Sequence, residues 1–202
     1  MTARGFPGRW LAAGLIAIVL AASPAAAKAP PALPFSFGGA YALTDHTGRA
    51  VTDRDFRGRF QLVFFGYTYC PDICPTGLTD MAAALDALGP LAERVQPLFI
   101  SVDPGRDTPA VLKDYVAHFH PRLIGLTGSE AQVRAAAKAY RVHRSKLVTQ
   151  GAKADEYLVN HTSITYLMAP DGTFVTLFPH GTKPAFMTKA LRKYLARDGG
   201  GS

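Results

Sequence analysis

The sequence predicts an α/β domain folded as a three-layer sandwich, in which a sheet lies between layers of helices. Short continuous apolar runs, typical of strands buried on both faces, alternate along the chain with amphipathic stretches of helical spacing. A composition of 48% hydrophobic and 18% charged residues is that of a chain that can build a core. The length of 202 residues allows one domain or at most two small ones.

Composition also excludes several classes of protein. Two cysteines cannot build a disulfide-dense scaffold or a four-cysteine zinc site. The formal net charge is +7, but the basic residues are spread along the chain, so we expect no nucleic-acid partner. The sequence shows no internal repeat, and no low-complexity block outside its two ends.

The first 27 residues have the pattern of an export signal. Arg4 and Arg9 precede an acid-free apolar stretch over 10–22, and small residues up to Ala27 supply a cleavage site. The stretch spans about 20 Å as a helix, short of a hydrocarbon core of about 30 Å, but its extension to Ala27 could just cross. We expect a cleaved signal peptide or a retained membrane anchor over 1–27, followed by a tether over 28–34. Either way, we expect an exported periplasmic protein, soluble or anchored to the inner membrane.

The first elements expected after the tether are a hairpin, a buried strand and a helix. Gly48 lies in a turn signal between the short segments 41–43 and 49–51, which predicts the hairpin. An apolar run over 61–65, bounded by glycines, predicts a strand buried on both faces. Apolar residues at helical spacing then predict a helix over 75–88.

The middle of the chain repeats the order of strand and helix. Residues 96–102 predict a second buried strand. Thr108 is a favourable N-cap with Pro109 at the first helical position, so a helix is expected to follow. Also expected are a short strand over 123–126 and a helix from a cap at Ser129 to about residue 140.

The last part of the chain combines an irregular segment with a hairpin and a closing helix. Residues 141–157 are polar and lack clear periodicity, so we expect an excursion from the sheet. Strands over 163–168 and 173–178 are joined by a strong turn signal. An amphipathic helix over 183–197 and a flexible tail over 198–202 complete the chain.

This order of elements, with a cysteine pair at the first junction of strand and helix, indicates a thioredoxin-like sheet. We expect one domain over 35–197. It should carry an N-terminal hairpin extension and a polar excursion before the loop that contains His161.

The cysteine pair is the strongest functional signal in the chain. Cys70 follows the buried strand, and Cys74 starts the helix, where free backbone N–H groups and the helix dipole stabilise an anionic sulfur. Three residues between them, including Pro71, let the loop turn so that the two sulfurs converge. Converging thiolates form either a disulfide or a chelate for a soft metal ion.

Other roles for the pair fit less well. A structural disulfide that closes so short a loop would stabilise the fold by only about 2 kcal/mol. A peroxidatic cysteine would have a threonine three residues upstream, where Tyr67 stands, and Thr68 lies one residue too close. The spacing is one residue longer than the C-x-x-C of thioredoxin, and zinc would need four ligands for a closed site.

Among the six histidines, His161 is the candidate for a site. It precedes the strand over 163–168, and in a thioredoxin-like sheet that loop faces the cysteine-bearing loop. The alternative is an ordinary loop histidine. The other five lie in expected turns, at a helix end or among basic residues: His46, His118, His120, His143 and His180.

Four sequence blocks are specific enough to compare with known families. They are FGYTYCPDICPT at 65–76, SVDPGRDTP at 101–109, GLTG at 125–128, and NHTS at 160–163 followed by YLMAPDG at 166–172. Together they resemble the Sco/SenC family of copper-handling proteins over roughly residues 35–195. The resemblance implies a thioredoxin-like fold, an exported or membrane-anchored chain, and copper bound by Cys70, Cys74 and His161.

One position departs from the family pattern. Members often have Asp before the ligand histidine, where this chain has Asn160. An amide adds neither negative charge nor ligand basicity, which bears on the preference for oxidised copper and not on the ligand set. Asp103 matches a family position near the site, although a turn residue before Pro104 explains it equally well.

Two thiolates and an imidazole suit Cu(I), and they hold Cu(II) with a further oxygen or nitrogen ligand. The resemblance implies a metallochaperone that delivers copper to the binuclear copper centre of cytochrome c oxidase subunit II. The alternative is a thiol–disulfide reductase that keeps the cysteines of that subunit, or of another periplasmic copper chaperone, reduced. Cys70 and Cys74 would then be catalytic, and His161 would be dispensable. A copper or redox sensor is a third, more remote interpretation.

Overall fold

The computed structural model describes residues 1–2, 36–148, 153 and 156–198. Contacts group Phe35–Ser202 as one unit, and the candidate site lies within it. Apart from residues 1 and 2, the expected signal peptide or anchor (1–27) and the tether (28–34) lie outside the described residues, as does the tail beyond Asp198. Within the described part, no helix is both long and apolar enough to cross a membrane.

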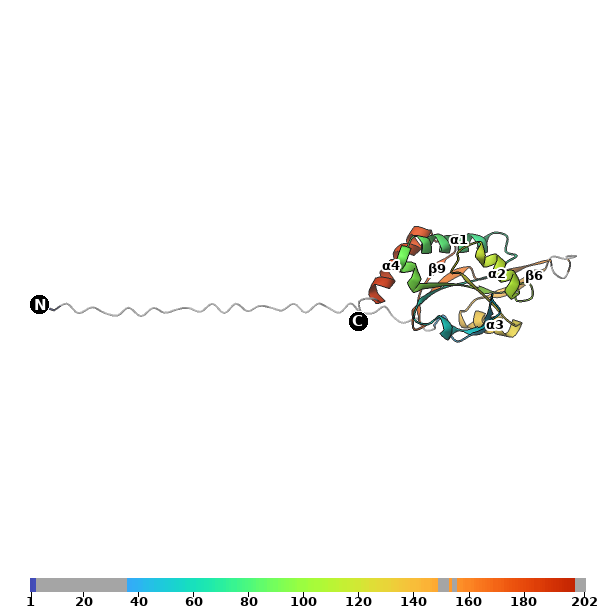
Figure 1. Cartoon of the computed structure of the whole chain (residues 1–202), viewed down its shortest axis with the longest axis horizontal. Coiled ribbons are helices and arrows are strands. Elements are labelled where there is room, and N and C mark those ends of the chain that lie inside the picture. Colours follow the sequence, from blue (N-terminus) through green and yellow to red (C-terminus); the bar gives the residue numbers. More distant parts are fainter. Residues whose placement is uncertain (3–35, 149–152, 154–155, 199–202) are drawn as a thin grey trace. The chain divides into compact units, whose positions relative to one another are not determined.

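A seven-stranded mixed sheet forms the centre of the domain (Figure 1). Its strands are β1 Ala42–Asp45, β2 Ala50–Thr52, β3 Phe60–Gly66, β4 Val95–Ser101, β5 Ile124–Thr127, β8 Ile164–Met168 and β9 Phe174–Pro179. The strand order is β2-β1-β5-β4-β3-β8-β9; β3, β4 and β5 are parallel, and the other neighbours are antiparallel. The inner strands β3 and β4 are buried along their whole length, which explains their continuous apolar sequences.

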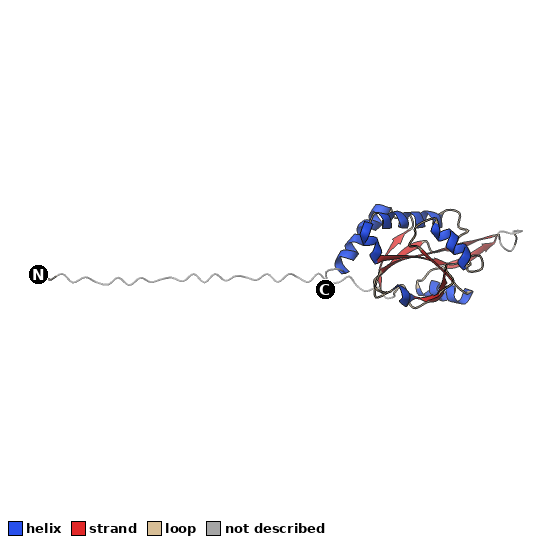
Figure 2. Ribbon diagram, viewed as in Figure 1, coloured by secondary structure: helices blue, strands red, loops and turns tan. Residues whose placement is uncertain are grey.

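Helices cover both faces of this sheet (Figure 2). The helices of the described residues are α1 Ile73–Asp86, α2 Pro109–Ala117, α3 Glu130–Ala139 and α4 Pro184–Asp198, with short 3-10 helices η1 Asp53–Phe56 and η2 Gly89–Arg94. Helices α1, α2 and α4 lie over one face, and α3 lies over the other. Successive side chains of β3 point to opposite faces of the sheet, so they pack against the two helical layers alternately. Phe64 packs against Gly77 of α1, and Phe65 packs on Tyr140, which follows α3.

A separate two-stranded antiparallel sheet carries His161. Strand β6, Arg144–Val148, pairs with β7, Tyr157–His161. The segment leaves the main sheet as expected, but the prediction that it is irregular is wrong, and His161 ends a strand instead of lying in a loop. Only Val159 is buried in these two strands, so the sequence lacks the alternation of buried and exposed positions that marks a strand.

The predicted thioredoxin-like α/β sandwich is confirmed, together with its N-terminal hairpin extension, β1–β2. The predicted caps form: the Thr108 hydroxyl accepts a hydrogen bond from the Val111 backbone, and Ser129 accepts one from Gln132. Helix α1 begins earlier than the expected residue 75, which places Cys74 within its first turn.

Candidate metal centre

The two cysteines lie where the central strand β3 leads into α1. Gly66 is the last residue of β3, Cys70 lies in the loop that follows, and Cys74 lies in the first turn of the helix. A Cβ atom at Gly66 would lie 2.9 Å from Cys74 Sγ and 2.7 Å from the Phe99 ring. The missing side chain therefore provides the space that the buried sulfur occupies.

A buried carboxylate holds the beginning of the cysteine loop. Asp107 accepts hydrogen bonds from the backbone N–H of Thr68, from the Thr68 hydroxyl at 2.6 Å and from the Ser101 hydroxyl at 2.6 Å. Burial raises the pKa of Asp107, and these donors oppose the shift. The cysteine loop is thereby tied to the connection between β4 and α2.

Cys70 is the sulfur that the helix N-terminus stabilises. The backbone N–H of Cys74, one of the free donors in the first turn of α1, donates to Cys70 Sγ at 3.4 Å. Hydrogen bonding by the Cys74 thiol lowers the pKa of Cys70 to about 5, against the opposing effect of partial burial. Cys70 is partly exposed, so at neutral pH it presents a thiolate to incoming groups.

Cys74 has the opposite properties. Its side chain is fully buried, and both its hydrogen bond to Cys70 and its burial raise its pKa. Cys74 therefore stays protonated while Cys70 is ionised. The expectation that the helix N-terminus would stabilise an anionic sulfur at Cys74 is therefore wrong: its free N–H group serves Cys70, and Cys70 is the more reactive cysteine.

His161 meets the cysteines from the small sheet, 87 positions along the chain from Cys74. Its Nδ1 lies 3.1 Å from the carbonyl oxygen of Val159, and because a carbonyl only accepts, the ring hydrogen is on Nδ1. In the neutral ring Nε2 then carries the lone pair, and it lies 3.5 Å from Cys74 Sγ. The ring of Tyr67 packs edge-on against the imidazole, with centroids 5.6 Å apart.

This separation fits two ligands of one metal ion. In zinc sites, bonds of about 2.3 Å to sulfur and about 2.0 Å to nitrogen, at a tetrahedral angle, place the two ligand atoms about 3.5 Å apart. Cys74 Sγ and His161 Nε2 already have that separation. No group of three or more His, Cys, Asp and Glu side chains among the described residues is placed to hold a metal ion as it stands. Completing a site with Cys70 therefore requires a side-chain movement.

A pocket of about 250 Å³ opens beside these side chains. Cys70 and His161 line it, and apolar side chains form part of its wall: Ile73, Leu147 and Leu158, which are 37%, 53% and 50% exposed. An incoming ligand can therefore approach Cys70 and His161 from solvent, whereas Cys74 is buried.

The remaining sequence candidates divide between this pocket and other places. Asn160 lines the pocket. Asp103 is instead bonded to Arg106 and to the hydroxyl of Tyr157. None of the other five histidines lines the pocket: His46, His118, His120, His143 and His180.

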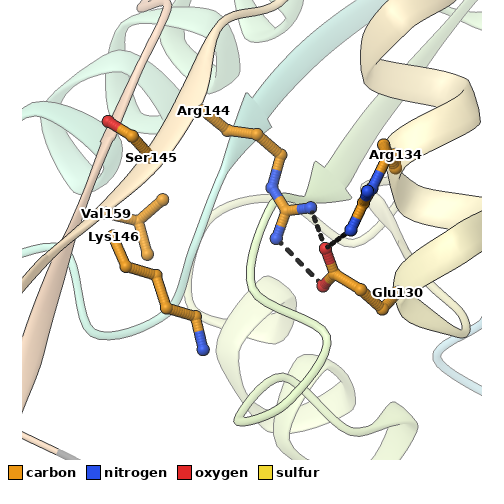
Figure 3. A pocket seen from close by; sticks show the side chains of 6 residues that line it. All are labelled: Glu130, Arg134, Arg144, Ser145, Lys146 and Val159. Carbon is orange, nitrogen blue, oxygen red and sulfur yellow. Dashed lines mark hydrogen bonds and ion pairs between the residues drawn. The ribbon is translucent and has the colours of Figure 1, made fainter.

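An ion pair at one end of the small sheet was not predicted. Arg144 donates to both carboxylate oxygens of Glu130 on α3, at 2.5 and 3.1 Å, and Arg134 reaches the same carboxylate at 3.3 Å (Figure 3). These residues line a second pocket, of about 410 Å³, which contains no sulfur or imidazole. The pair connects residues 14 positions apart on different elements, for which the sequence carries no signal.

Comparisons with known proteins agree on one family. The SCO1/SenC family profile matches residues 29–196. "Protein SCO1 homolog, mitochondrial" from Homo sapiens is 43% identical over 162 residues, which cover 78% of this chain and 52% of that protein. "Protein sco1" from Schizosaccharomyces pombe is 41% identical over 158 residues, covering 78% and 60%. The chain thus matches about half to three fifths of the length of these relatives.

Solved structures show the same relationship. Bradyrhizobium japonicum ScoI with copper bound has a TM-score of 0.72 and 43% identity, covering 79% of this chain and 99% of that one. Yeast Sco1 with copper bound has a TM-score of 0.73 and 36% identity, covering 80% and 89%. The expectation of copper agrees with these neighbours. BsSco, described as a member of the Sco family of cytochrome c oxidase assembly proteins, shares the fold at 23% identity, with a TM-score of 0.60 and coverage of 80% and 94%.

The relatives also correct the expected location. Those from Homo sapiens, Bos taurus and Saccharomyces cerevisiae are named as mitochondrial proteins. Export to the periplasm, whether as a soluble or an inner-membrane protein, conflicts with those names, and that expectation is wrong by this comparison. The resemblance carried by the four sequence blocks is confirmed: the chain belongs to the SCO1/SenC family.

Proposed function

We propose that the domain binds copper through Cys70, Cys74 and His161 and passes it on as a metallochaperone. The observation that carries this proposal is the position of His161 Nε2, 3.5 Å from Cys74 Sγ. A thiol–disulfide couple needs only the two sulfurs, whereas a soft metal ion gains a third ligand from the imidazole. The copper-bound Sco structures from Bradyrhizobium japonicum and yeast support copper as the metal.

The three side chains would receive the ion in different protonation states. Cys70 is a thiolate and His161 presents a lone pair on Nε2, while Cys74 must release its proton as the ion binds. Copper affinity is therefore expected to rise with pH. The ligand set suits Cu(I), and Cu(II) would need a further oxygen or nitrogen ligand. Asn160 in the pocket wall adds no negative charge toward the oxidised ion.

The open side of the site suits transfer between proteins. Cys70 and His161 line a pocket that is open to solvent, so ligands of a second protein can replace them one after the other. As the recipient we propose the binuclear copper centre of cytochrome c oxidase subunit II, which the family resemblance implies. Another copper chaperone is the further partner that this role would require as a source of the ion.

A thiol–disulfide reductase is the second candidate, favoured by the contrast between the two cysteines. The Cys70 thiolate would attack a disulfide of cytochrome c oxidase subunit II, forming a mixed disulfide and releasing one thiolate, which takes up a proton from solvent. Cys74 would then attack the Cys70 sulfur of the mixed disulfide, and its proton would pass to the partner's second sulfur as that sulfur leaves, so that a Cys70–Cys74 disulfide remains. The partner gains two electrons and two protons, and an external dithiol must restore this chain. His161 has no part in these steps.

An anaerobic Cu(I) titration of the reduced protein against a chromophoric chelator separates the two candidates. His161→Ala is expected to weaken Cu(I) binding by at least about tenfold and to leave the midpoint potential of the cysteine pair nearly unchanged. Cys70→Ser and Cys74→Ser are expected to abolish both activities. His143→Ala is the matched control, because His143 lies outside the pocket and should leave binding unchanged.

The result of the titration decides between copper delivery and the reductase role. Tight binding of one Cu(I) per chain, weakened in His161→Ala but not in His143→Ala, supports a three-ligand site and copper delivery. Binding that is weak, or indifferent to His161, would make the dithiol the functional unit and favour the reductase.

A further inference from the structure

Arg106, in the loop between β4 and α2, bonds to the strand that carries His161. Its Nε donates to Oδ2 of Asp103 at 2.5 Å, and its Nη1 donates to the carbonyl of Tyr157, the first residue of β7, at 3.0 Å. The guanidinium carbon lies 3.7 Å from the centroid of the Tyr157 ring. The Tyr157 hydroxyl donates to Oδ1 of the same Asp103 at 2.7 Å, so the three residues form a closed set. The carboxylate is 1% exposed and the Arg106 side chain 12%.

Aromatic side chains of the cysteine loop lie against the same guanidinium. The ring centroids of Tyr69 and Tyr67 lie 4.7 and 5.8 Å from the guanidinium carbon of Arg106. Tyr67 is buried and also packs edge-on against His161. Arg106 therefore contacts both segments that carry the proposed ligands.

The sheet that carries His161 depends on such contacts. It has two strands and does not pair with the seven-stranded sheet. A two-stranded hairpin by itself is only marginally stable in water. Besides the burial of Val159 in the core, contacts at its ends hold its position relative to the cysteines, by Arg106 at Tyr157 and by Glu130 at Arg144.

We propose that Arg106 is a positioning residue that sets how closely His161 approaches the two sulfurs. The inference rests on the proposed function, since it concerns the same site. Strand β7 transmits the restraint, because Tyr157 and His161 are its two ends and it is paired with β6 throughout. A guanidinium is required: its planar set of donors bonds a carboxylate and a carbonyl while it stacks on a ring, which an ammonium group cannot do.

The test is a double-mutant cycle with Cu(I) affinity as its main readout. Arg106→Lys keeps the positive charge and is expected to weaken Cu(I) binding about tenfold. In the His161→Ala background the same substitution should have no further effect, because the ligand that it positions is gone. Hydrogen exchange of the β7 amides should become faster in Arg106→Lys, while the midpoint potential of the cysteine pair changes little.

A matched control and a milder variant accompany the cycle. Arg94 also donates to a carboxylate and a carbonyl, those of Asp198 and Leu195, but it lies on η2, away from both ligand segments. Arg94→Lys should therefore leave Cu(I) affinity unchanged. Tyr157→Phe removes only the hydroxyl that bonds Asp103 and keeps the ring against the guanidinium. It is expected to weaken Cu(I) binding about fivefold, and it serves as the test if Arg106→Lys folds poorly.

The outcomes separate the inference from the proposed function. If His161→Ala leaves Cu(I) binding unchanged, the proposed function fails and the positioning role falls with it. If His161→Ala weakens binding but Arg106→Lys and Tyr157→Phe do not, the positioning role is wrong and the function stands. If Arg106→Lys weakens binding equally in both backgrounds, Arg106 acts on the fold in general, which overturns the inference.

Discussion

Arg144 lies directly opposite His161 in the small sheet, and the two residues form the last pair at one end of strands β6 and β7. The side chain of Arg144 forms a bidentate ion pair with Glu130 in the first turn of α3 (Figure 3). Hydrogen bonding by Arg144 holds the pKa of Glu130 below its usual range, so the carboxylate stays ionised at physiological pH. The backbone that carries the proposed histidine ligand is therefore tied to a helix of the main domain.

Glu130→Gln should loosen this attachment and weaken Cu(I) binding. The carboxylate is half exposed, and an ion pair of that kind contributes about 1 kcal/mol or less, so the loss of affinity should be at most about fivefold. Chelator competition at low ionic strength measures the loss, and hydrogen exchange should show faster exchange of the β7 amides.

Arg134→Gln is the control for that substitution. Arg134 also pairs with Glu130, but both residues lie on α3, so their contact does not reach the small sheet. Cu(I) affinity should be unchanged in Arg134→Gln. Equal losses in Glu130→Gln and Arg134→Gln would show that the charge of the region matters, and not the attachment of β6.

Alkylation should distinguish the two cysteines by pH. Because the pKa of Cys70 is lowered to about 5, its reaction with iodoacetamide should already be near its plateau at neutral pH, with a midpoint near pH 5. Cys74 is buried with a raised pKa and should react only after unfolding. Mass spectrometry of the labelled peptide between pH 4 and pH 9 measures both. A midpoint near the ordinary thiol value of about 8.5 would contradict the assignment.

The same shift implies a change of stability with pH. The folded pKa of Cys70, about 5, lies below the unfolded value, so between the two the unfolded chain binds more protons and stability rises with pH. This contribution is complete above the unfolded pKa, and it is lost as the pH falls through the folded pKa. Cys70→Ser should therefore flatten the rise in Tm between about pH 5 and pH 8.5, compared with the unchanged reduced protein.

Local patterns were enough to predict most of the fold. Strands β3 and β4 are buried on both faces, and their sequences are therefore apolar almost throughout. The helix caps are local as well, because the side chains of Thr108 and Ser129 bond to backbone N–H groups only three positions ahead. The small sheet was missed because its strands are mostly exposed, and exposed strands need no alternation of apolar and polar residues.

The candidate site was predictable only in part, for a related reason. The cysteine spacing is local, and the position of His161 follows from the topology of the sheet. The contacts of Arg106 join residues 51 positions apart, and the bond between Tyr157 and Asp103 joins residues 54 apart. Such contacts depend on how the small sheet lies against the β4–α2 loop, and no local pattern in the sequence determines that placement.

Gly66 offers a test of the space that the buried sulfur needs. An added Cβ would lie 2.9 Å from Cys74 Sγ and 2.7 Å from the Phe99 ring, and that ring is enclosed by the rings of Phe64 and Tyr115. Gly66→Ala should therefore destabilise the fold by about 1–3 kcal/mol, as overpacking does, and weaken Cu(I) binding by displacing Cys74. Urea unfolding and chelator competition measure the two effects.

Gly105→Ala is the matched substitution for Gly66→Ala. A Cβ at Gly105 would meet nothing closer than 3.9 Å, at Asp103 Oδ1 and the Tyr157 hydroxyl, which is ordinary contact. Stability and Cu(I) affinity should therefore change little, although Gly105 lies in the loop that contains Arg106. If Gly66→Ala were tolerated as well as Gly105→Ala, the packing around Cys74 would have to be looser than the distances at Gly66 imply. The buried sulfur would then be free to move, instead of staying fixed beside His161 while the Cys70 side chain moves to complete the site.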